Sequence, residues 1–280
     1  MLEDFAVFII SHNKPINETY KTLQKCNYTG PYYFILDDED RKIKSYRKLY
    51  GEEHVKIFSK KEMAKKFNSF DNFNFDNVII YARNACYDIA EELGIHYFIE
   101  LDDDYDQFRL RFPQEENLSI MHSKNINKVL DCCLNYYKKC KAIKILAMCQ
   151  GSDVQAVQTG KVLRKAMNGL FCCTERRVVF NGRINEDVNS YTRYNQLGEI
   201  FMSLPNVHLN QLPTQTTGGM AGTYATYGTY VKSFYSVIQC PSFVKVSTFS
   251  KGFRMAKFRM HHKIFSKYGY AKILSDKYKK

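Results

Sequence analysis

The chain has 280 residues, of which 45% are hydrophobic and 25% are charged. This composition is typical of a globular protein and excludes a disordered or fibrous chain. It contains no uninterrupted apolar stretch of about 18 residues, so we expect no membrane span. Acids at Glu3 and Asp4 argue against a signal peptide, and nine cysteines without CxxC spacing indicate reduced thiols, as in a cytoplasmic protein.

The net charge of +12 is unevenly distributed along the chain. Residues 1–199 contain 29 Lys and Arg and 28 Asp and Glu, whereas residues 200–280 contain 12 Lys and Arg and one acid, Asp276. Solubility does not require such segregation, so the basic C-terminal part predicts a polyanionic partner or ligand. A solvated basic tail is the alternative.

In the first 105 residues, short apolar runs alternate with helical patterns. The predicted strands span residues 5–10, 32–36, 54–58 and 96–101, and the predicted helices span 17–25, 41–49 and 77–93. Such alternation predicts parallel strands joined by right-handed crossovers, with ligands bound at the carboxyl ends of the strands. We therefore expect a Rossmann-like nucleotide-binding half, residues 1–105, whose loops at 11–15, 37–40 and 102–104 lie at the ligand edge.

The remainder of the chain, residues 106–280, has a less regular pattern. Its predicted helices span 125–140 and about 223–239, and its strand-like segments span 143–148, 169–173, 200–204, 207–211 and 243–248. No Pro/Gly/Ser-rich linker and no internal repeat separates the two halves. The sequence therefore predicts one domain over residues 1–280, of the α/β class, with a mixed, mostly parallel sheet flanked by helices.

Three carboxylates follow the last predicted strand of the first half. The strand at 96–101 leads directly into Asp102, Asp103 and Asp104. Because these groups repel one another and hard divalent cations prefer oxygen ligands, the cluster predicts a Mg²⁺ or Mn²⁺ site. A solvated acidic turn is the alternative. The turn at 37–40 is a candidate for that interpretation, so acidity alone does not decide between the two.

A second acidic pair, Glu186 and Asp187, follows a tight turn that Gly182 permits. We expect a helix to begin near Asn189, just after the pair. The N-terminus of a helix favours the anionic form of a carboxyl group, which a general base requires. The alternative is that Asp187 simply caps the helix.

Basic and imidazole side chains elsewhere are suited to an anionic ligand and a metal. His261 and His262 lie in the basic segment, and one of them is a candidate to complete a metal shell begun by Asp104. Lys263 is suited to contact phosphate groups. Arg83, in the helix before the acidic strand, is suited to reach a diphosphate, although a surface charge on the helix is the alternative.

The order of these motifs resembles that of one enzyme family. The motifs are Ile10–Pro15, Ala82–Asn84, Leu101–Asp104, Gly182–Asp187 and His261–Lys263. Together they resemble the TET-associated glycosyltransferases, GT-A enzymes of tailed bacteriophages that glycosylate hydroxymethylated DNA bases. The resemblance extends over about residues 5–274 and implies a GT-A-like fold, with residues 106–280 as the acceptor-binding half.

The resemblance also implies a role for each motif. The residues that would bind the UDP-sugar donor are Ser11, His12, Asn13, Lys14, Arg83, Asp102, Asp103 and Lys263. Asp104 would bind Mn²⁺ or Mg²⁺ with His261 or His262, and Asp187 would act as the catalytic base, with Glu186 as the other candidate. The implied reaction is inverting transfer of a sugar to a hydroxymethylpyrimidine, with 5-hydroxymethylcytosine as the expected base, in double-stranded DNA.

In this interpretation the enzyme acts in the host cytoplasm during phage infection, with no membrane and no protein partner. Three alternatives stay open: a GT-A enzyme acting on a cell-surface glycan or protein, a metal-dependent nuclease, and a non-catalytic DNA-binding module. The single acid in residues 200–280 argues against the nuclease, which needs dispersed carboxylates around two ions. The DNA-binding module leaves both acidic motifs unexplained.

Overall fold

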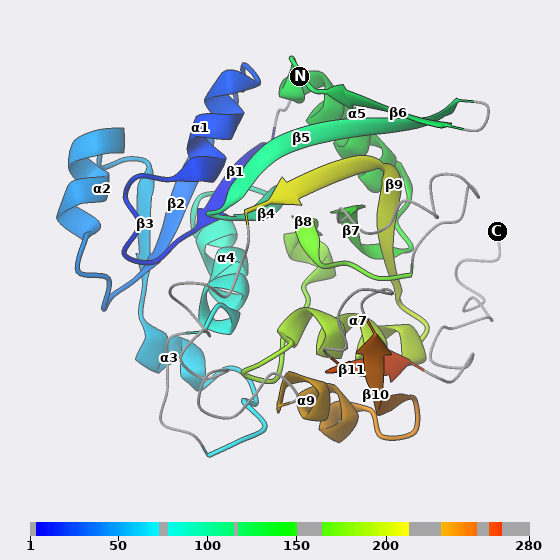
Figure 1. The fold of residues 1–280 in the computed structure, drawn as a ribbon. Coiled ribbons are helices and arrows are strands. Elements are labelled where there is room, and N and C mark those ends of the chain that lie inside the picture. The colour runs from blue at the N-terminus through cyan, green and yellow to red at the C-terminus, as the bar shows by residue number, and fades with distance from the viewer. Residues whose placement is uncertain are drawn as a thin grey trace.

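A large mixed sheet forms the centre of the molecule (Figure 1). The computed structural model describes residues 4–72, 78–114, 117–149, 164–212, 231–250 and 258–264, with the backbone alone in 113–114, 117–122, 248–250 and 258–264. Within these residues the nine strands of the sheet lie in the order β3-β2-β1-β4-β8-β7-β9-β5-β6. They span Phe5–Ile10 (β1), Tyr32–Asp37 (β2), Val55–Phe58 (β3), Tyr97–Asp102 (β4), Tyr105–Gln114 (β5), Asn117–His122 (β6), Ile143–Cys149 (β7), Asn168–Cys173 (β8) and Ile200–Gln211 (β9).

The pairing of the strands changes between the two halves of the chain. β3, β2, β1 and β4 pair in parallel, which confirms the prediction for the first half. β8 is antiparallel to both β4 and β7, whereas β7 and β9 are parallel. β10 (Val244–Ser250) and β11 (Phe258–Ile264) form a separate antiparallel pair. The predicted α/β class with a mixed sheet is confirmed, and the division of the chain at residue 105 stays a prediction.

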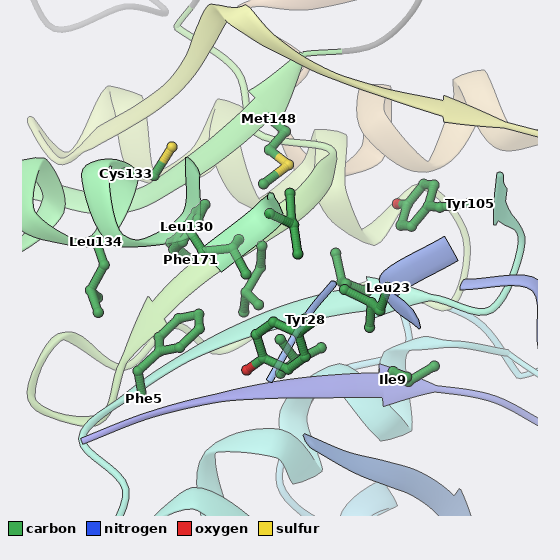
Figure 2. Packing of buried hydrophobic residues seen from close by; sticks show 14 of the residues in the cluster. Phe5, Ile9, Leu23, Tyr28, Tyr105, Leu130, Cys133, Leu134, Met148 and Phe171 are labelled. Atoms are coloured by element: carbon green, nitrogen blue, oxygen red, sulfur yellow. The ribbon is translucent and has the colours of Figure 1, made fainter. Parts of the chain in front are cut away.

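Helices cover both faces of the sheet (Figure 1). They are α1 (Glu18–Lys25), α2 (Ile43–Tyr50), α3 (Lys60–Ala64), α4 (Ile80–Glu92), α5 (Ile126–Lys139), α7 (Glu186–Gln196) and α9 (Val231–Gln239), with a 3₁₀ turn η1 (Thr174–Arg176). Phe5 and Ile9 of β1 belong to one buried cluster with Leu23 of α1 and Leu130 of α5 (Figure 2), whereas Phe8 lies in the cluster on the α4 side. A strand buried on both faces is apolar throughout, which explains the continuous hydrophobic run at 5–10. None of the described helices is long and apolar enough to cross a lipid bilayer.

β9 is one long strand, where the sequence predicts two segments at 200–204 and 207–211. Its pairing with β7 shifts register between Leu204 and His208. Pro205, which has no amide hydrogen to donate to a neighbouring strand, lies in this interval. The first segment pairs with β7 and the second pairs mainly with β5, so the predicted segments are the two halves of a bent strand.

Other elements also differ from the sequence prediction. No counterpart was predicted for α3, β5, β6 and β11. The predicted helix start near Asn189 was wrong, because α7 begins at Glu186. The helix predicted at 223–239 is confirmed for α9, Val231–Gln239, and residues 223–230 lie outside the described part of the chain. The strand predicted at 243–248 corresponds to β10.

Arg176 ties the C-terminal end of α5 to β7. Its guanidinium donates hydrogen bonds to the carbonyl oxygens of Tyr137, Cys140 and Ile143, the shortest being 2.7 Å to Ile143. Its Cζ atom also lies 3.8 Å from the centre of the Tyr137 ring. We expect Arg176→Ala to lower the free energy of unfolding by about 2–3 kcal/mol, measured by urea denaturation. Arg41→Ala removes an exposed arginine and should change that energy by less than about 0.5 kcal/mol; equal losses in both variants would contradict the prediction.

Candidate active site

The loop after β1 and the turn after β4 form one hydrogen-bonded unit. Ser11 donates a hydrogen bond from Oγ to Oδ2 of Asp103 at 2.9 Å, and Lys14 Nζ lies 3.0 Å from Oδ1 of the same carboxylate. Tyr46 of α2 lies behind the loop: its Oη is 2.7 Å from Ser11 Oγ and accepts a hydrogen bond from the Lys14 amide at 3.0 Å. Because β1 and β4 are parallel neighbours, the contacts lie at their carboxyl ends, where ligands of such sheets bind.

A cavity of about 240 Å³ opens beside these loops. Its lining residues are Ile10, Ser11, His12, Asp37, Phe58, Lys60, Val78, Ile79, Ala82, Asp102, Asp103, Asp104 and Gln211. Asp37 Oδ2 lies 2.6 Å from His12 Nδ1, and Asp37 Oδ1 lies 3.2 Å from Lys60 Nζ. Burial raises the pKa of Asp37, but the hydrogen bond from His12 and the charge of Lys60 outweigh it and hold that pKa below its usual value. Asp37, at the start of the acidic turn, therefore forms a charged part of the cavity wall together with His12 and Lys60.

The carboxylate of Asp104 lies in the wall of the cavity and is held there by Gln211. Nε2 of Gln211, at the end of β9, donates to its two oxygens at 3.0 and 3.2 Å. Burial and the neighbouring charge of Asp102 raise the pKa of Asp104 to about 6. A bound cation favours the ionised form of a carboxyl group and would reverse this shift. Burial and repulsion at this position thus fit a ligand of positive charge.

Arg83 of α4 joins the two acidic motifs. Its Nη2 lies 3.1 Å from Oδ1 of Asp102, and its Nε lies 2.9 Å from Oε1 of Glu186. The third contact is from Nη1 to Oε2 of Glu100 at 3.2 Å. Arg83 is 4% exposed and Glu100 is fully buried, and this burial raises the pKa of Glu100 to about 8. The guanidinium is therefore held by carboxylates of the protein itself, and its contact with a donor stays a prediction.

The acidic pair is presented by a turn with two left-handed residues. Gly182 has a φ of +82°, and a Cβ there would lie 2.4 Å from Nδ2 of Asn189, so a larger residue would displace its neighbours. Asn185 has a φ of 62°, a conformation that asparagine tolerates better than most residues. Since α7 begins at the next residue, Glu186 and Asp187 lie in its first turn, where the helix dipole favours carboxylates.

Glu186 and Asp187 have different surroundings. Glu186 is 8% exposed and bound to Arg83. Asp187 is half-buried, and its Oδ1 accepts a hydrogen bond from the Val188 amide at 2.7 Å. Burial and the adjacent charge of Glu186 raise the pKa of Asp187 to about 7. A carboxyl group with such a pKa exchanges a proton near neutral pH, which is the property of an effective general base.

Most of the predicted site residues meet at this edge of the sheet. Asn13 shapes the loop: its amide donates to Asp40 Oδ2 at 2.8 Å, and its Oδ1 accepts from the Arg41 amide at 3.0 Å. His261 and His262 belong to β11. Their side chains, like that of Lys263, lie outside the described part of the chain, so the predicted roles of all three stay predictions. Within the described residues, no three His, Cys, Asp or Glu side chains form a group suited to a metal ion.

The sequence interpretation missed three polar residues of the cavity. The turn at 37–40 was placed at the ligand edge, but no role was predicted for Asp37, and Lys60 belongs to a charged segment, α3, without a hydrophobic pattern. Gln211 ends the predicted strand at 207–211, and its position at a strand end is the one signal that points to it. These residues are recognisable only once distant segments are brought together.

Several solved structures are similar to this chain at low sequence identity. A similar solved structure is that of a mycobacterial protein, at 8% identity and a TM-score of 0.48, covering 94% of this chain and 84% of that one. Glucosyl-3-phosphoglycerate synthase from Mycobacterium tuberculosis, in complex with Mg²⁺ and UDP, is similar at 8% identity and a TM-score of 0.48, with 94% and 88% covered. GalNAc-T7 with UDP, GalNAc and Mn²⁺ is similar at 12% identity and a TM-score of 0.45, with 75% and 44% covered.

No curated protein matches the chain. The family model of the TET-associated glycosyltransferases matches it over residues 5–220. This match covers more than half of the chain and includes both acidic motifs and the loop after β1. The chain belongs to the TET-associated glycosyltransferase family and is a glycosyltransferase.

Proposed function

We propose that this glycosyltransferase transfers a sugar from a UDP-sugar to the hydroxymethyl group of a pyrimidine in double-stranded DNA, with 5-hydroxymethylcytosine as the expected acceptor. The observation that carries the proposal is the bridge through Arg83, which joins the cavity-lining Asp102 to Glu186 beside Asp187. A donor bound in the cavity would then lie near a base for the acceptor hydroxyl. The basic segment 200–280 supports DNA as the acceptor, because phosphate contacts supply most non-specific affinity.

Asp104 is the proposed ligand for Mn²⁺ or Mg²⁺. Its half-buried carboxylate lines the cavity and is the kind of oxygen donor that hard divalent cations prefer. When bound, such an ion stabilises the negative charge of the departing diphosphate. His261 or His262 is the proposed further ligand. Lys14, whose side chain is 53% exposed beside Asp103, is the proposed contact for the diphosphate.

In the proposed reaction Asp187 accepts the proton of the acceptor hydroxyl. The hydroxyl oxygen then forms a bond to the anomeric carbon of the sugar, while the bond from that carbon to the diphosphate breaks and UDP leaves. A single displacement of this kind inverts the anomeric configuration, through an oxocarbenium-like transition state. We assign the base to Asp187 because Glu186 is already bound to Arg83.

A transfer assay tests the proposal. The protein is incubated with a panel of UDP-sugars and duplex oligonucleotides that carry 5-hydroxymethylcytosine, 5-hydroxymethyluracil or unmodified cytosine, and the products are analysed by mass spectrometry. We expect a mass increase of one sugar residue on a hydroxymethylated duplex and none on the unmodified one. Transfer to glycans or proteins alone would contradict the DNA acceptor, and strand cleavage without transfer would favour the nuclease.

Asp104→Asn should remove most of the transfer activity. The lost charge weakens both cation binding and stabilisation of the diphosphate, so we expect turnover to fall by about 10²-fold or more. The matched control is Asp106→Asn, whose carboxylate accepts a hydrogen bond from Asn210 at 2.7 Å and does not line the cavity. It should keep near-normal turnover. Excess EDTA should stop the wild-type enzyme, and full turnover in EDTA would contradict the metal.

DNA affinity should fall as the salt concentration rises. Residues 245–280 contain eleven Lys and Arg and one acid. If about four to six of these cations neutralise phosphates, log affinity should fall against log salt with a slope of about −3.6 to −5.4. Fluorescence anisotropy of a labelled duplex measures this slope. Charge reversal at Lys277, Lys279 and Lys280 should make the slope less negative. An affinity independent of salt would contradict a DNA-binding basic segment.

A further inference from the structure

Helix α9 contacts the turn that presents the acidic pair. This helix, Val231–Gln239, lies beyond residue 220, where the family match ends. Two adjacent side chains of α9, Tyr235 and Ser236, are 3% and 1% exposed. Each side chain connects to the turn at residues 182–185 through its own hydrogen bonds.

The first chain of contacts runs through a buried ion pair. Tyr235 donates from Oη to the carboxylate of Asp71. The two oxygens of Asp71 lie 3.0 and 3.2 Å from Nε of Arg183, which also donates from Nη1 to Tyr81 Oη at 3.3 Å. The side chains of Arg183 and Asp71 are 7% and 9% exposed. Because hydrogen bonds strengthen where water is excluded, this network holds Arg183 in one geometry.

The second contact acts at the residue before the acidic pair. Nδ2 of Asn185 donates to Oγ of Ser236 at 2.9 Å. Asn185 has a φ of 62°, a left-handed conformation that even asparagine adopts less readily than glycine does. A hydrogen bond that fixes its side chain therefore also favours the backbone conformation from which α7 starts.

A loop on the other side completes the enclosure of the turn. The amides of Gly182 and Arg183 donate to the carbonyl oxygens of Asn68 and Ser69 at 2.7 and 2.9 Å. The same loop carries Asp71. The turn thus contacts both the loop at 68–71 and α9, and the hydrogen bond from Tyr235 to Asp71 connects the loop to the helix.

We propose that α9 holds Asp187 in its active orientation, with Tyr235, Ser236, Asp71 and Arg183 as positioning residues. The inference rests on the proposed function, because it concerns the base of that reaction. A displacement of about 1 Å at a reacting group costs on the order of 10²-fold in rate. α9 packs against β10 and β11, which belong to the basic part of the chain, so an acceptor bound there would act on the same helix.

The test compares two α9 variants with two matched controls. Tyr235→Phe and Ser236→Ala each remove one hydrogen bond and little volume. Tyr137→Phe and Ser203→Ala remove comparable bonds to backbone carbonyls, of 2.7 and 2.6 Å, away from the turn. We expect kcat to fall about tenfold in each α9 variant and about 10²-fold in the double variant, while KM for the UDP-sugar stays within about twofold. The controls should keep kcat within about twofold of the wild type.

Hydrogen exchange gives a readout that does not depend on the reaction. The amides of residues 182–189 should exchange faster in both α9 variants and at the wild-type rate in the controls. A kcat within about twofold of the wild type in both α9 variants, equal losses in the controls, or unchanged exchange would overturn the proposal.

The two proposals can fail separately. If the wild type glycosylates an acceptor other than DNA, the DNA acceptor is wrong, and kcat with the true acceptor tests the role of α9. If the wild type transfers no sugar at all, the exchange rates at 182–189 decide whether α9 orders the turn.

Discussion

Asp187→Asn is expected to lower turnover by about 10²–10⁴-fold, the range typical of losing a general base. The amide cannot accept the proton of the acceptor hydroxyl, whereas the shape of the turn is retained. Donor affinity should change little, because Asp187 is not among the residues that line the cavity. Single-turnover rates and the KM for the donor measure the two effects. Near-normal turnover, or a product that retains the anomeric configuration, would contradict an inverting base at this position.

The pH dependence should identify the same group. Burial and the charge of Glu186 raise the pKa of Asp187 to about 7, so its basic form is populated only above about that pH. The single-turnover rate should therefore rise with pH through about 7 and then level off. In Asp187→Asn the residual rate should lack this rise. If the rise of the rate with pH persists in this variant, the base is another group, and Glu186 is the first candidate.

Arg83→Gln is expected to lower the free energy of unfolding by about 3–5 kcal/mol at pH 7. The change removes the buried guanidinium from between Glu100, Asp102 and Glu186. Burial already raises the pKa of Glu100 to about 8, and without the guanidinium its ionised form has no positive partner, so the loss of stability grows as pH rises through about 8 and shrinks as pH falls. Urea unfolding at about pH 7 and about pH 9 should show a smaller loss at the lower pH.

A surface arginine provides the control for this change. Arg177 forms ion pairs with Asp88 and Glu91, and its side chain is 33% exposed. Arg177→Gln should therefore cost less than about 1 kcal/mol, as for other solvent-exposed pairs. Two results would contradict the role given to the ion pairs of Arg83. One is an equal loss of stability in the two variants, and the other is a loss in Arg83→Gln that is no smaller at the lower pH.

Local sequence signals predicted the acidic part of the site. A buried strand must end near an edge of the sheet, so the run at 96–101 identifies the position of Asp102 to Asp104 without knowledge of the rest of the fold. The contact of Lys60 with Asp37 and that of Tyr235 with Asp71 have no such signal, because their partners are brought together only by tertiary packing.

Two differences between prediction and structure have identifiable physical causes. The alternation of Phe108 and Leu110 with charged Arg109 and Arg111 is typical of a strand and is the signal for β5 that the prediction did not use. The predicted start of α7 near Asn189 treated the acidic pair as preceding the helix. In the structure the left-handed Asn185 ends the turn, so the helix includes the pair.

The acidic turn also joins two strands that are not neighbours in the sheet. Only Asp103 and Asp104 separate β4 from β5 in the chain, yet β8, β7 and β9 lie between them in the sheet. The turn is also fixed to the end of β9, because the Leu212 amide donates to the carbonyl oxygen of Asp104 at 3.0 Å. An added or deleted residue here would shift β5 by one position against β9 and turn its side chains to the opposite face. We therefore expect an insertion or deletion in this turn to disturb the sheet as well as the acidic motif, whereas a substitution changes the motif alone.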